Sequence, residues 1–363
     1  MHKLFSIRKK LDFPNNVIRT TFYFLGIKFS FKKRVPKGYL EENYPKNILQ
    51  IAQKYSYFGG KSVGQIKNKR EHFENISNLK QNLSEDALTH LNTILHRIDK
   101  IVVAGNNVHP YGNAVVYTDN QEIEALKNCS SFSEEITQME GYYQYKHYKL
   151  PIDGFSSSVF LYKHGMDTLK TLKNIGNKTF IDVGTCMGDS ILVFRDYTEN
   201  KIIGFEPVQS THALALKTME LNNIDNVLIE KLSLGEVAEE LQRIVYPEHV
   251  AWSTLRELAR ANTEHYPETV KCETLDSYVA RNDLKVGLIK VDIEGFELSF
   301  LKGAIRTIRE QKPILLLSIY HSYHDFYKIK PWLEDMDLGY QFDFFKGVDG
   351  NPIDETLLIC EVY

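Results

Sequence analysis

The sequence has few cysteines, and none of them stands in a metal-binding or redox spacing. Its 363 residues include four cysteines, which lie far apart at Cys129, Cys186, Cys272 and Cys360, with no C-x-x-C pair and no histidine at zinc-finger distance. This pattern excludes a zinc knuckle and a disulfide-stapled scaffold. We therefore expect reduced thiols.

Long apolar runs and a broad basic excess are also missing. The stretch TFYFLGIKFSF from Thr21 to Phe31 is interrupted by Lys28 and is much shorter than the roughly 20 residues of a membrane span. The N-terminus does not have the apolar core of a signal peptide, so we expect a cytoplasmic protein. The net charge of −3 disfavours nucleic acid as a partner, because such binding requires a broad basic field.

The N-terminus of the chain is basic and rich in aromatic residues. Residues 1–34 hold nine lysines and arginines against Asp12 alone. Phe22 to Phe31 alternates loosely around Gly26, which predicts a hairpin or an edge strand. Two roles stay open for residues 1–36: a solvated basic arm, or peripheral contact with the anionic inner face of the cytoplasmic membrane.

Residues 37–150 form a second region, which we expect to be mainly helical. Tyr44–Tyr57 and Ser84–Ile101 have helical periodicity. The second stretch carries an apolar stripe at Leu88, Leu91, Leu95 and Ile98, with Ser84 placed as the N-cap. This region could grip an acceptor or form a homodimer, and the sequence does not choose between the two. The aromatic YYQYKHY (142–148) predicts a connector that packs a domain junction or stacks on a ligand.

Residues 151–363 alternate strands and helices. The short apolar runs FIDV, IIGFE, VLIEKL, VGLIKVD and PILLLSIY are separated by helical stretches. Apolar runs without polar alternation are typical of a parallel sheet that helices cover on both faces. The sequence therefore predicts a doubly wound, mostly parallel α/β domain.

The loop TFIDVGTCMGDS (179–190) indicates a nucleotide-type ligand beyond the first of these strands. A nicotinamide site would need G-x-G-x-x-G, but Cys186 takes the place of the second glycine. S-adenosylmethionine fits better, because Asp182 would attract its positive charge and Glu206 would bind both ribose hydroxyls. The cofactor-binding residues that we predict from this loop and the next strand are Asp182, Gly184, Gly188, Asp189, Ser190 and Glu206.

The segment IKVDIEGFE (289–297) brings ionisable groups to the end of another apolar strand. Lys290 and Asp292 share one face, and Glu294 follows. We predict Asp292 as the general base or as a ligand of Mg²⁺, with Glu294 its partner and Lys290 tuning the pair. Two alternatives stay open: Lys290 forms an internal ion pair with Asp292 or Glu294 that only fixes the loop, or His321 is the base.

Two further acidic residues look structural in the sequence. In TLDSYVA, Asp276 stands where a helix N-cap belongs. Glu297 is expected to decorate the surface of a helix that ends at Gly303.

At this point the chain resembles the FkbM-type methyltransferases, many of which methylate hydroxyl groups of sugars or natural products. The matching pieces, over roughly residues 155–345, are FIDVGTCMGDS, IGFEP, SLG, ETLDSY, LIKVDIEGFELSFLKGA and KPILLLSIYH. The resemblance implies a class I methyltransferase, Rossmann-like fold. It also implies S-adenosylmethionine as the cofactor and places Ser233, in the Leu232–Gly235 turn, near adenine.

We therefore expect an O-methyltransferase whose acceptor is a sugar, sugar nucleotide or glycan, in the synthesis of a bacterial surface polysaccharide. The first alternative is a nicotinamide-dependent sugar-nucleotide oxidoreductase, which Cys186 in the place of the second glycine disfavours. The second is a binding protein that keeps the methyltransferase fold without turnover.

Overall fold

The computed structural model describes residues 5–12, 17–24, 27–34, 69–104, 120–245, 266–349 and 353–363. At the N-terminus, β1 (Phe5–Asp12), β2 (Val17–Phe24) and β3 (Ile27–Arg34) pair antiparallel in that order. The hairpin expected around Gly26 is confirmed, with a third strand added. The helix expected at Tyr44–Tyr57 lies outside the described residues.

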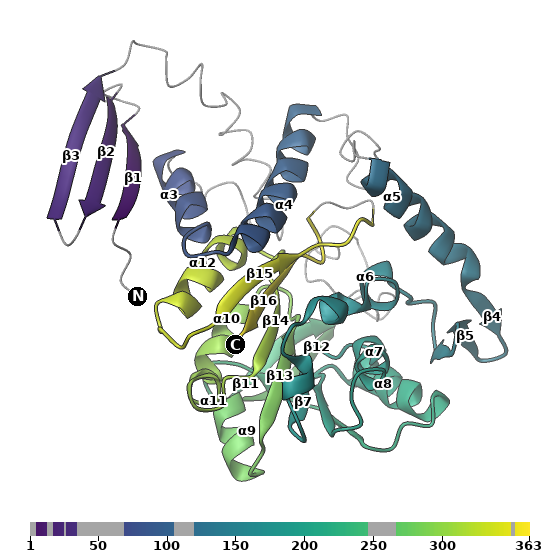
Figure 1. Cartoon of the computed structure of the whole chain (residues 1–363). Coiled ribbons are helices and arrows are strands. Elements are labelled where there is room, and N and C mark those ends of the chain that lie inside the picture. Colours follow the sequence, from purple (N-terminus) through teal and green to yellow (C-terminus); the bar gives the residue numbers. More distant parts are fainter. Residues whose placement is uncertain are drawn as a thin grey trace.

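In the described residues between this sheet and Phe132, three α-helices are present: α3 (Lys69–Leu79), α4 (Glu85–Ala104) and α5 (Asn120–Phe132). Helix α4 is the one expected from the leucine stripe, and the backbone N–H of Ala87 donates to the Ser84 hydroxyl at 3.2 Å, which confirms the cap. Its apolar stripe packs against the C-terminal strand β15, and α3 packs against α12 (Figure 1).

The end of this region is a small sheet and not a helix. Strands β4 (Thr137–Met139), β5 (Tyr142–Tyr145) and β6 (Tyr148–Leu150) pair antiparallel. Tyr145 and Tyr148 are both 2% exposed, and their rings contact Phe160. Of the two readings of the aromatic run, the structure favours packing at a junction.

The main body is a seven-stranded sheet in the order β15-β16-β14-β13-β7-β8-β9. All pairings among β14, β13, β7, β8 and β9 are parallel, and β16 pairs antiparallel with both neighbours. The mostly parallel sheet expected from the apolar runs is thus confirmed. The strands are β7 (Thr179–Val183), β8 (Ile202–Phe205), β9 (Val227–Glu230), β13 (Val286–Val291), β14 (Ile314–Ser318), β15 (Gln341–Phe345) and β16 (Leu357–Glu361).

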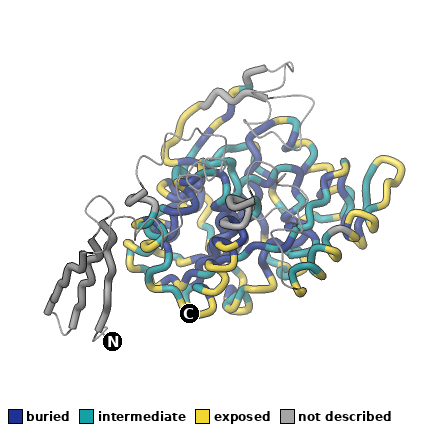
Figure 2. The backbone as a smooth tube through the Cα atoms, turned by 90° about the horizontal axis from the view of Figure 1, so that it is seen from above, coloured by how far each residue is buried: buried dark blue, intermediate teal, exposed yellow. Residues whose placement is uncertain are grey.

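Helices cover both faces of this sheet and create two separate cores. In β7, Phe180 joins the core under the short helix α6 (Ser157–Phe160), α7 (Asp189–Arg195) and α8 (Gln209–Leu221). The next residue, Ile181, joins the opposite core, under α9 (Leu275–Arg281), α10 (Glu297–Gly303), α11 (Ile305–Gln311) and α12 (Tyr323–Glu334). Because alternate strand residues point to opposite faces and both faces are covered, most positions in the central strands are apolar. In Figure 2 the buried segments of the backbone, coloured dark blue, lie in the centre of the molecule.

A second small sheet pairs β10 (Ser233–Leu234) and β11 (Glu239–Val245) with β12 (Tyr266–Glu273). The N-cap of α9 is Thr274, whose side chain accepts from Ser277 N, so the expectation that Asp276 caps this helix is wrong. Asp276 instead accepts from the backbone N–H groups of Arg306 and Thr307 at 2.9 and 2.8 Å. Asp276 therefore caps the start of α11, and the sequence around Asp276 does not indicate a contact with that helix.

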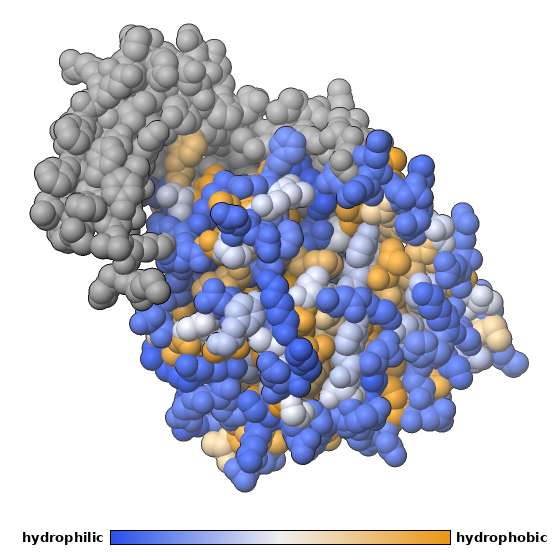
Figure 3. All heavy atoms as spheres, in the orientation of Figure 1, coloured by the Kyte–Doolittle hydropathy of each residue, from blue (hydrophilic) through white to orange (hydrophobic). Residues whose placement is uncertain are grey.

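The face of the molecule seen in Figure 3 is mainly hydrophilic, with apolar side chains in small groups. Among the described helices, none combines the length and the apolar composition that a bilayer crossing requires.

Candidate functional site

The carboxyl ends of β7, β8 and β13 lie side by side, and the sequence-predicted residues gather there. Strand register places Asp182 between Gly204 and Lys290. Glu206 and Asp292 follow directly beyond their strands. The sheet topology thus brings residues that are up to 110 positions apart in the sequence to one edge, which is where α/β sheets bind ligands.

Two glycines shape the loop after β7. Gly184 has φ +80°, and a Cβ atom there would lie 1.9 Å from the carbonyl oxygen of Asp292. Gly188 has φ +82° and begins α7, where a Cβ would meet Met219 at 2.9 Å. The positive φ favours glycine at both positions, and at Gly184 the backbone of Asp292 also leaves no room for a side chain.

The loop uses its own backbone donors. Gly184 N and Thr185 N both donate to the Phe205 carbonyl at 3.1 Å, and Gly188 N donates to the Thr185 carbonyl at 2.8 Å. Cys186 N donates to Oε2 of Glu206 at 3.0 Å. A pyrophosphate-binding loop turns such N–H groups toward the phosphates, whereas these four are already satisfied within the protein.

Glu206 is held rigidly at this edge. Besides Cys186, its carboxylate accepts from Val208 N at 3.0 Å and from the Thr211 hydroxyl at 2.8 Å. The side chain is 7% exposed. Thr211 was not foreseen, because a threonine in the first turn of a helix has no distinctive sequence signal. The contact of Glu206 with ribose stays a prediction.

Asp182 and Lys290 form a buried ion pair. Lys290 Nζ lies 2.9 Å from Asp182 Oδ1 and donates to the Gly184 carbonyl at 2.8 Å. The Ser190 hydroxyl donates to Asp182 Oδ2 at 2.6 Å. Burial alone would lower the pKa of Lys290, but Asp182 and Asp292 raise it above its ordinary value. The alternative in which Lys290 forms its ion pair with Asp292 or Glu294 is therefore wrong, because the register places Lys290 opposite Asp182.

Two other predicted cofactor residues lie around this pair. Asp189 is the first residue of α7, and burial raises its pKa to about 6 although Lys290 acts in the opposite direction. Ser233 lies on β10, beside Cys272 of β12. Their contacts with a cofactor stay predictions.

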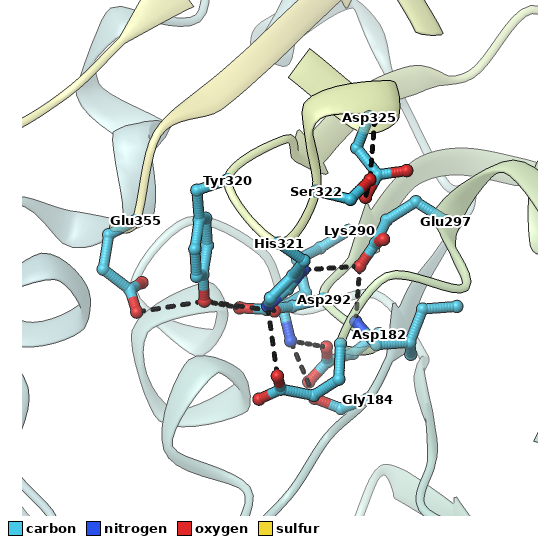
Figure 4. A network of polar contacts seen from close by, with 12 residues as sticks. Asp182, Gly184, Lys290, Asp292, Glu297, Tyr320, His321, Ser322, Asp325 and Glu355 are labelled. Atoms are coloured by element: carbon cyan, nitrogen blue, oxygen red, sulfur yellow. Dashed lines mark hydrogen bonds and ion pairs between the residues drawn. The ribbon is translucent and has the colours of Figure 1, made fainter. Parts of the chain in front are cut away.

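Asp292 belongs to a second polar network, which Figure 4 shows together with the first. His321, which is 2% exposed, joins three carboxylates: Nδ1 lies 2.8 Å from Glu297 Oε1, and Nε2 lies 3.3 Å from Asp292 and 3.7 Å from Glu294. Burial would lower the pKa of His321, but the hydrogen bond to Glu297 and the three negative charges raise it to about 10. His321 is thus a cation at neutral pH, and a cation does not accept a proton as a base.

Glu297 contradicts its sequence interpretation. Its side chain has no exposed surface, and it accepts from Ile293 N at 3.0 Å as well as from His321. It begins α10 and fixes the loop that carries Asp292. Its position at the start of a helix looks like a surface position, and only the arrival of His321 from another strand explains its burial.

Tyr320 and Glu355 complete the network and were missed in the sequence. The Tyr320 hydroxyl lies 3.3 Å from both carboxylate oxygens of Asp292 and 3.2 Å from Glu355 Oε1. Burial and the charge of Asp292 raise the pKa of Glu355 to about 7. Residue 355 comes from a C-terminal loop with no motif, so only the fold could reveal it.

A buried histidine near the site was also missed. His164 is 2% exposed and lies in the 3₁₀ segment η5 (Lys163–Thr168), where its φ of 50° is unusual for a non-glycine residue. Among the described residues, neither ring nitrogen has a hydrogen-bond partner. Burial and the charge of Lys290 lower the pKa of His164 to about 4, so it is neutral.

One cluster among the described residues brings three metal-ligand types together: Asp292, Glu297 and His321 offer atoms within 4.8 Å of one another. Mg²⁺ prefers near-octahedral oxygen ligands, whereas one of these three side chains offers a histidine nitrogen, and Nδ1 of that histidine is bonded to Glu297. These residues do not fit Mg²⁺, and we derive no step through a metal.

The sheet order and the loops at its carboxyl edge together define a class I methyltransferase fold. Its elements are the parallel sheet with one inserted antiparallel strand, the acid-and-glycine loop after β7, and the second acid after β8. Residues 182–342 match the family described as the methyltransferase FkbM domain.

The chain is also similar to individual proteins and solved structures. "Methyltransferase 1" of Beauveria bassiana is 28% identical over 141 residues, which are 34% of this chain and 57% of that protein. The match thus spans little more than half of that relative. Methyltransferase FkbM from Methylobacillus flagellatus superposes with a TM-score of 0.49 and 17% identity over 80% of this chain and 59% of that one. The SAH-bound methyltransferase PaMTH1 of Podospora anserina superposes with a TM-score of 0.31 and 12% identity, over 68% of this chain and 89% of that one.

Proposed function

We propose that the chain is an S-adenosylmethionine-dependent O-methyltransferase that acts on a sugar hydroxyl. The observation that carries the choice of cofactor is the loop after β7. Four of its N–H groups are bonded within the protein, one of them to Glu206. The loop therefore offers these donors to no phosphate, and the acids around it suit a cofactor with a positive sulfonium and no phosphate.

This arrangement disfavours the nicotinamide alternative. A dinucleotide needs free amides at the loop and room for two negative phosphates. Here the N–H of Cys186 already donates to Glu206, and Asp189 is the first residue of α7. Both carboxylates would repel a pyrophosphate.

The carboxylates divide into two groups with different tasks. Asp182 is neutralised by Lys290 and holds the loop, so in this proposal it orients the cofactor site. Asp292 has a partly exposed side chain, at 19%, and it is our proposed general base. His321 and Glu297 keep Asp292 in place, and Glu294, at 34% exposed, lies at the rim.

S-adenosylmethionine, when bound, supplies an electrophilic methyl group on sulfur. A hydroxyl group attacks such a carbon efficiently only if a base removes its proton and its oxygen is aligned. The Asp292 carboxylate meets the first requirement. Asp292, Tyr320 and Glu355 together present several hydrogen-bonding atoms, which suits a polyhydroxylated acceptor such as a sugar or glycan.

The test is methyl transfer to a panel of sugars and glycans by Asp292→Asn beside a matched control. We expect Asp292→Asn to lose at least about 100-fold in turnover while it keeps its affinity for the cofactor. Asp225→Asn, an exposed acid before β9, should leave both unchanged. Normal turnover by Asp292→Asn would remove Asp292 as the base, and cofactor binding without transfer to any acceptor would favour the binding-protein alternative.

A further inference from the structure

The Tyr320 hydroxyl lies between two carboxylates that come from distant parts of the chain. It is 3.3 Å from both oxygens of Asp292 and 3.2 Å from Glu355 (Figure 4). Tyr320 follows β14, Asp292 follows β13, and Glu355 precedes β16. The three groups therefore meet only because these strands are neighbours in the sheet.

The contacts limit how many protons Tyr320, Asp292 and Glu355 can share. A tyrosine hydroxyl has one proton to donate and lone pairs to accept. It can donate to one carboxylate at a time, so two charged carboxylates would leave one without a donor from Tyr320 and close to a like charge. Both contacts are satisfied when one carboxyl group carries a proton and donates it to the phenol oxygen.

We propose that Glu355 receives, through Tyr320, the proton that Asp292 takes from the acceptor hydroxyl. This inference rests on the proposed function. The groups that face Glu355 are Asp292, Lys346, Asp349 and Ser158 in addition to Tyr320. Burial, together with the charges of Asp292 and Asp349, raises the pKa of Glu355 to about 7 against the opposing effects of Lys346 and Ser158, so this carboxylate can take up and release a proton near neutral pH.

Methyl transfer is followed by two proton transfers through Tyr320. The acceptor oxygen loses its proton to Asp292 as it bonds to the methyl carbon, and the carbon–sulfur bond breaks with its electron pair left on sulfur. Protonated Asp292 then donates to the Tyr320 oxygen while Tyr320 passes its own proton to Glu355. Glu355 releases that proton to water, which restores the charged Asp292 for the next cycle. Tyr320 stays a neutral phenol, because burial and both neighbouring carboxylates raise its pKa well above its ordinary value.

The sign of the pH effect follows from this order. Glu355 must be ionised to receive a proton, so kcat should rise with pH through about 7. Glu355→Gln cannot take the proton, and Tyr320→Phe cannot pass it on. We expect kcat in either variant to fall about tenfold and to lose this rise, with cofactor affinity unchanged. Glu310→Gln, an exposed residue of α11, is the matched control.

A second measurement needs no acceptor. Infrared difference spectra between about pH 6 and about pH 8 should show a protonated carboxyl band that disappears as the pH rises. The band should be present in wild type and Glu310→Gln and reduced in Glu355→Gln. An unchanged band or an unchanged pH profile in Glu355→Gln would overturn the relay. Failure of wild type to bind S-adenosylmethionine would instead overturn the proposed function and leave the infrared result standing.

Discussion

Replacing Lys290 with methionine tests whether this lysine holds the site together. Methionine keeps most of the length of the side chain and removes the charge. Lys290 and Asp182 have side-chain exposures of only 5% and 0% and lie 2.9 Å apart. The variant leaves the Asp182 carboxylate buried with Ser190 as a remaining donor and without its cation.

The expected cost follows from that burial. Removing one partner of a buried ion pair destabilises a protein by about 3–5 kcal/mol. For a domain of this size, each kcal/mol lowers the melting temperature by about 2–4 °C. We therefore expect Lys290→Met to melt roughly 10 °C below wild type. Asp182→Asn combined with Lys290→Met should recover a large part of this loss, because no uncompensated charge then remains in the core.

Lys302→Met is the control. Lys302 pairs with Glu236 at 3.1 Å, but the two side chains are 43% and 50% exposed, so the loss should stay below about 1 kcal/mol. The assay is thermal or denaturant unfolding of all variants, with turnover measured on those that fold. If Lys290→Met were as stable as Lys302→Met and had lost only turnover, Lys290 would tune catalysis and the structural argument would be wrong.

Two other variants probe the same edge of the sheet. The pKa of His321 is raised to about 10 in the folded protein from about 6.5 in the unfolded chain. Its contribution to stability, on the order of 4 kcal/mol, is fully present below pH 6.5 and is lost as the pH rises through about 10. The stability difference between wild type and His321→Phe in unfolding experiments should shrink over that range, and a constant difference would show that His321 is not charged. Gly184→Ala places a Cβ 1.9 Å from a carbonyl oxygen and should cost at least about 2 kcal/mol. Gly141→Ala, with a similar φ of +81° and open space, should cost only about 1 kcal/mol, and equal losses in the two would refute the steric argument.

The sequence predicted the sheet and its ligand edge well, because these depend on local patterns. Buried parallel strands are recognised by apolar runs without alternation, and the loop after β7 by its glycines and acids. Asp182, Glu206 and Asp292 could therefore be placed at one edge of the sheet before the fold was known.

The sequence did not predict which charges meet. Lys290 pairs with Asp182 because of the register between β13 and β7, which no local pattern contains. Glu297 was taken for a surface residue, since its burial depends on His321 arriving from β14. Glu355 has no motif at all. Long-range contacts of this kind shift the pKa of a group such as His321, and no local sequence pattern contains them.

The central claim is that this edge of the sheet binds S-adenosylmethionine, and calorimetric titration tests it most directly. The purified protein would be titrated separately with S-adenosylmethionine, its demethylated product and NAD. We predict heat of binding for the first two and none for NAD, because the loop amides are already engaged. Binding of NAD alone would contradict the account and make the chain a nicotinamide enzyme.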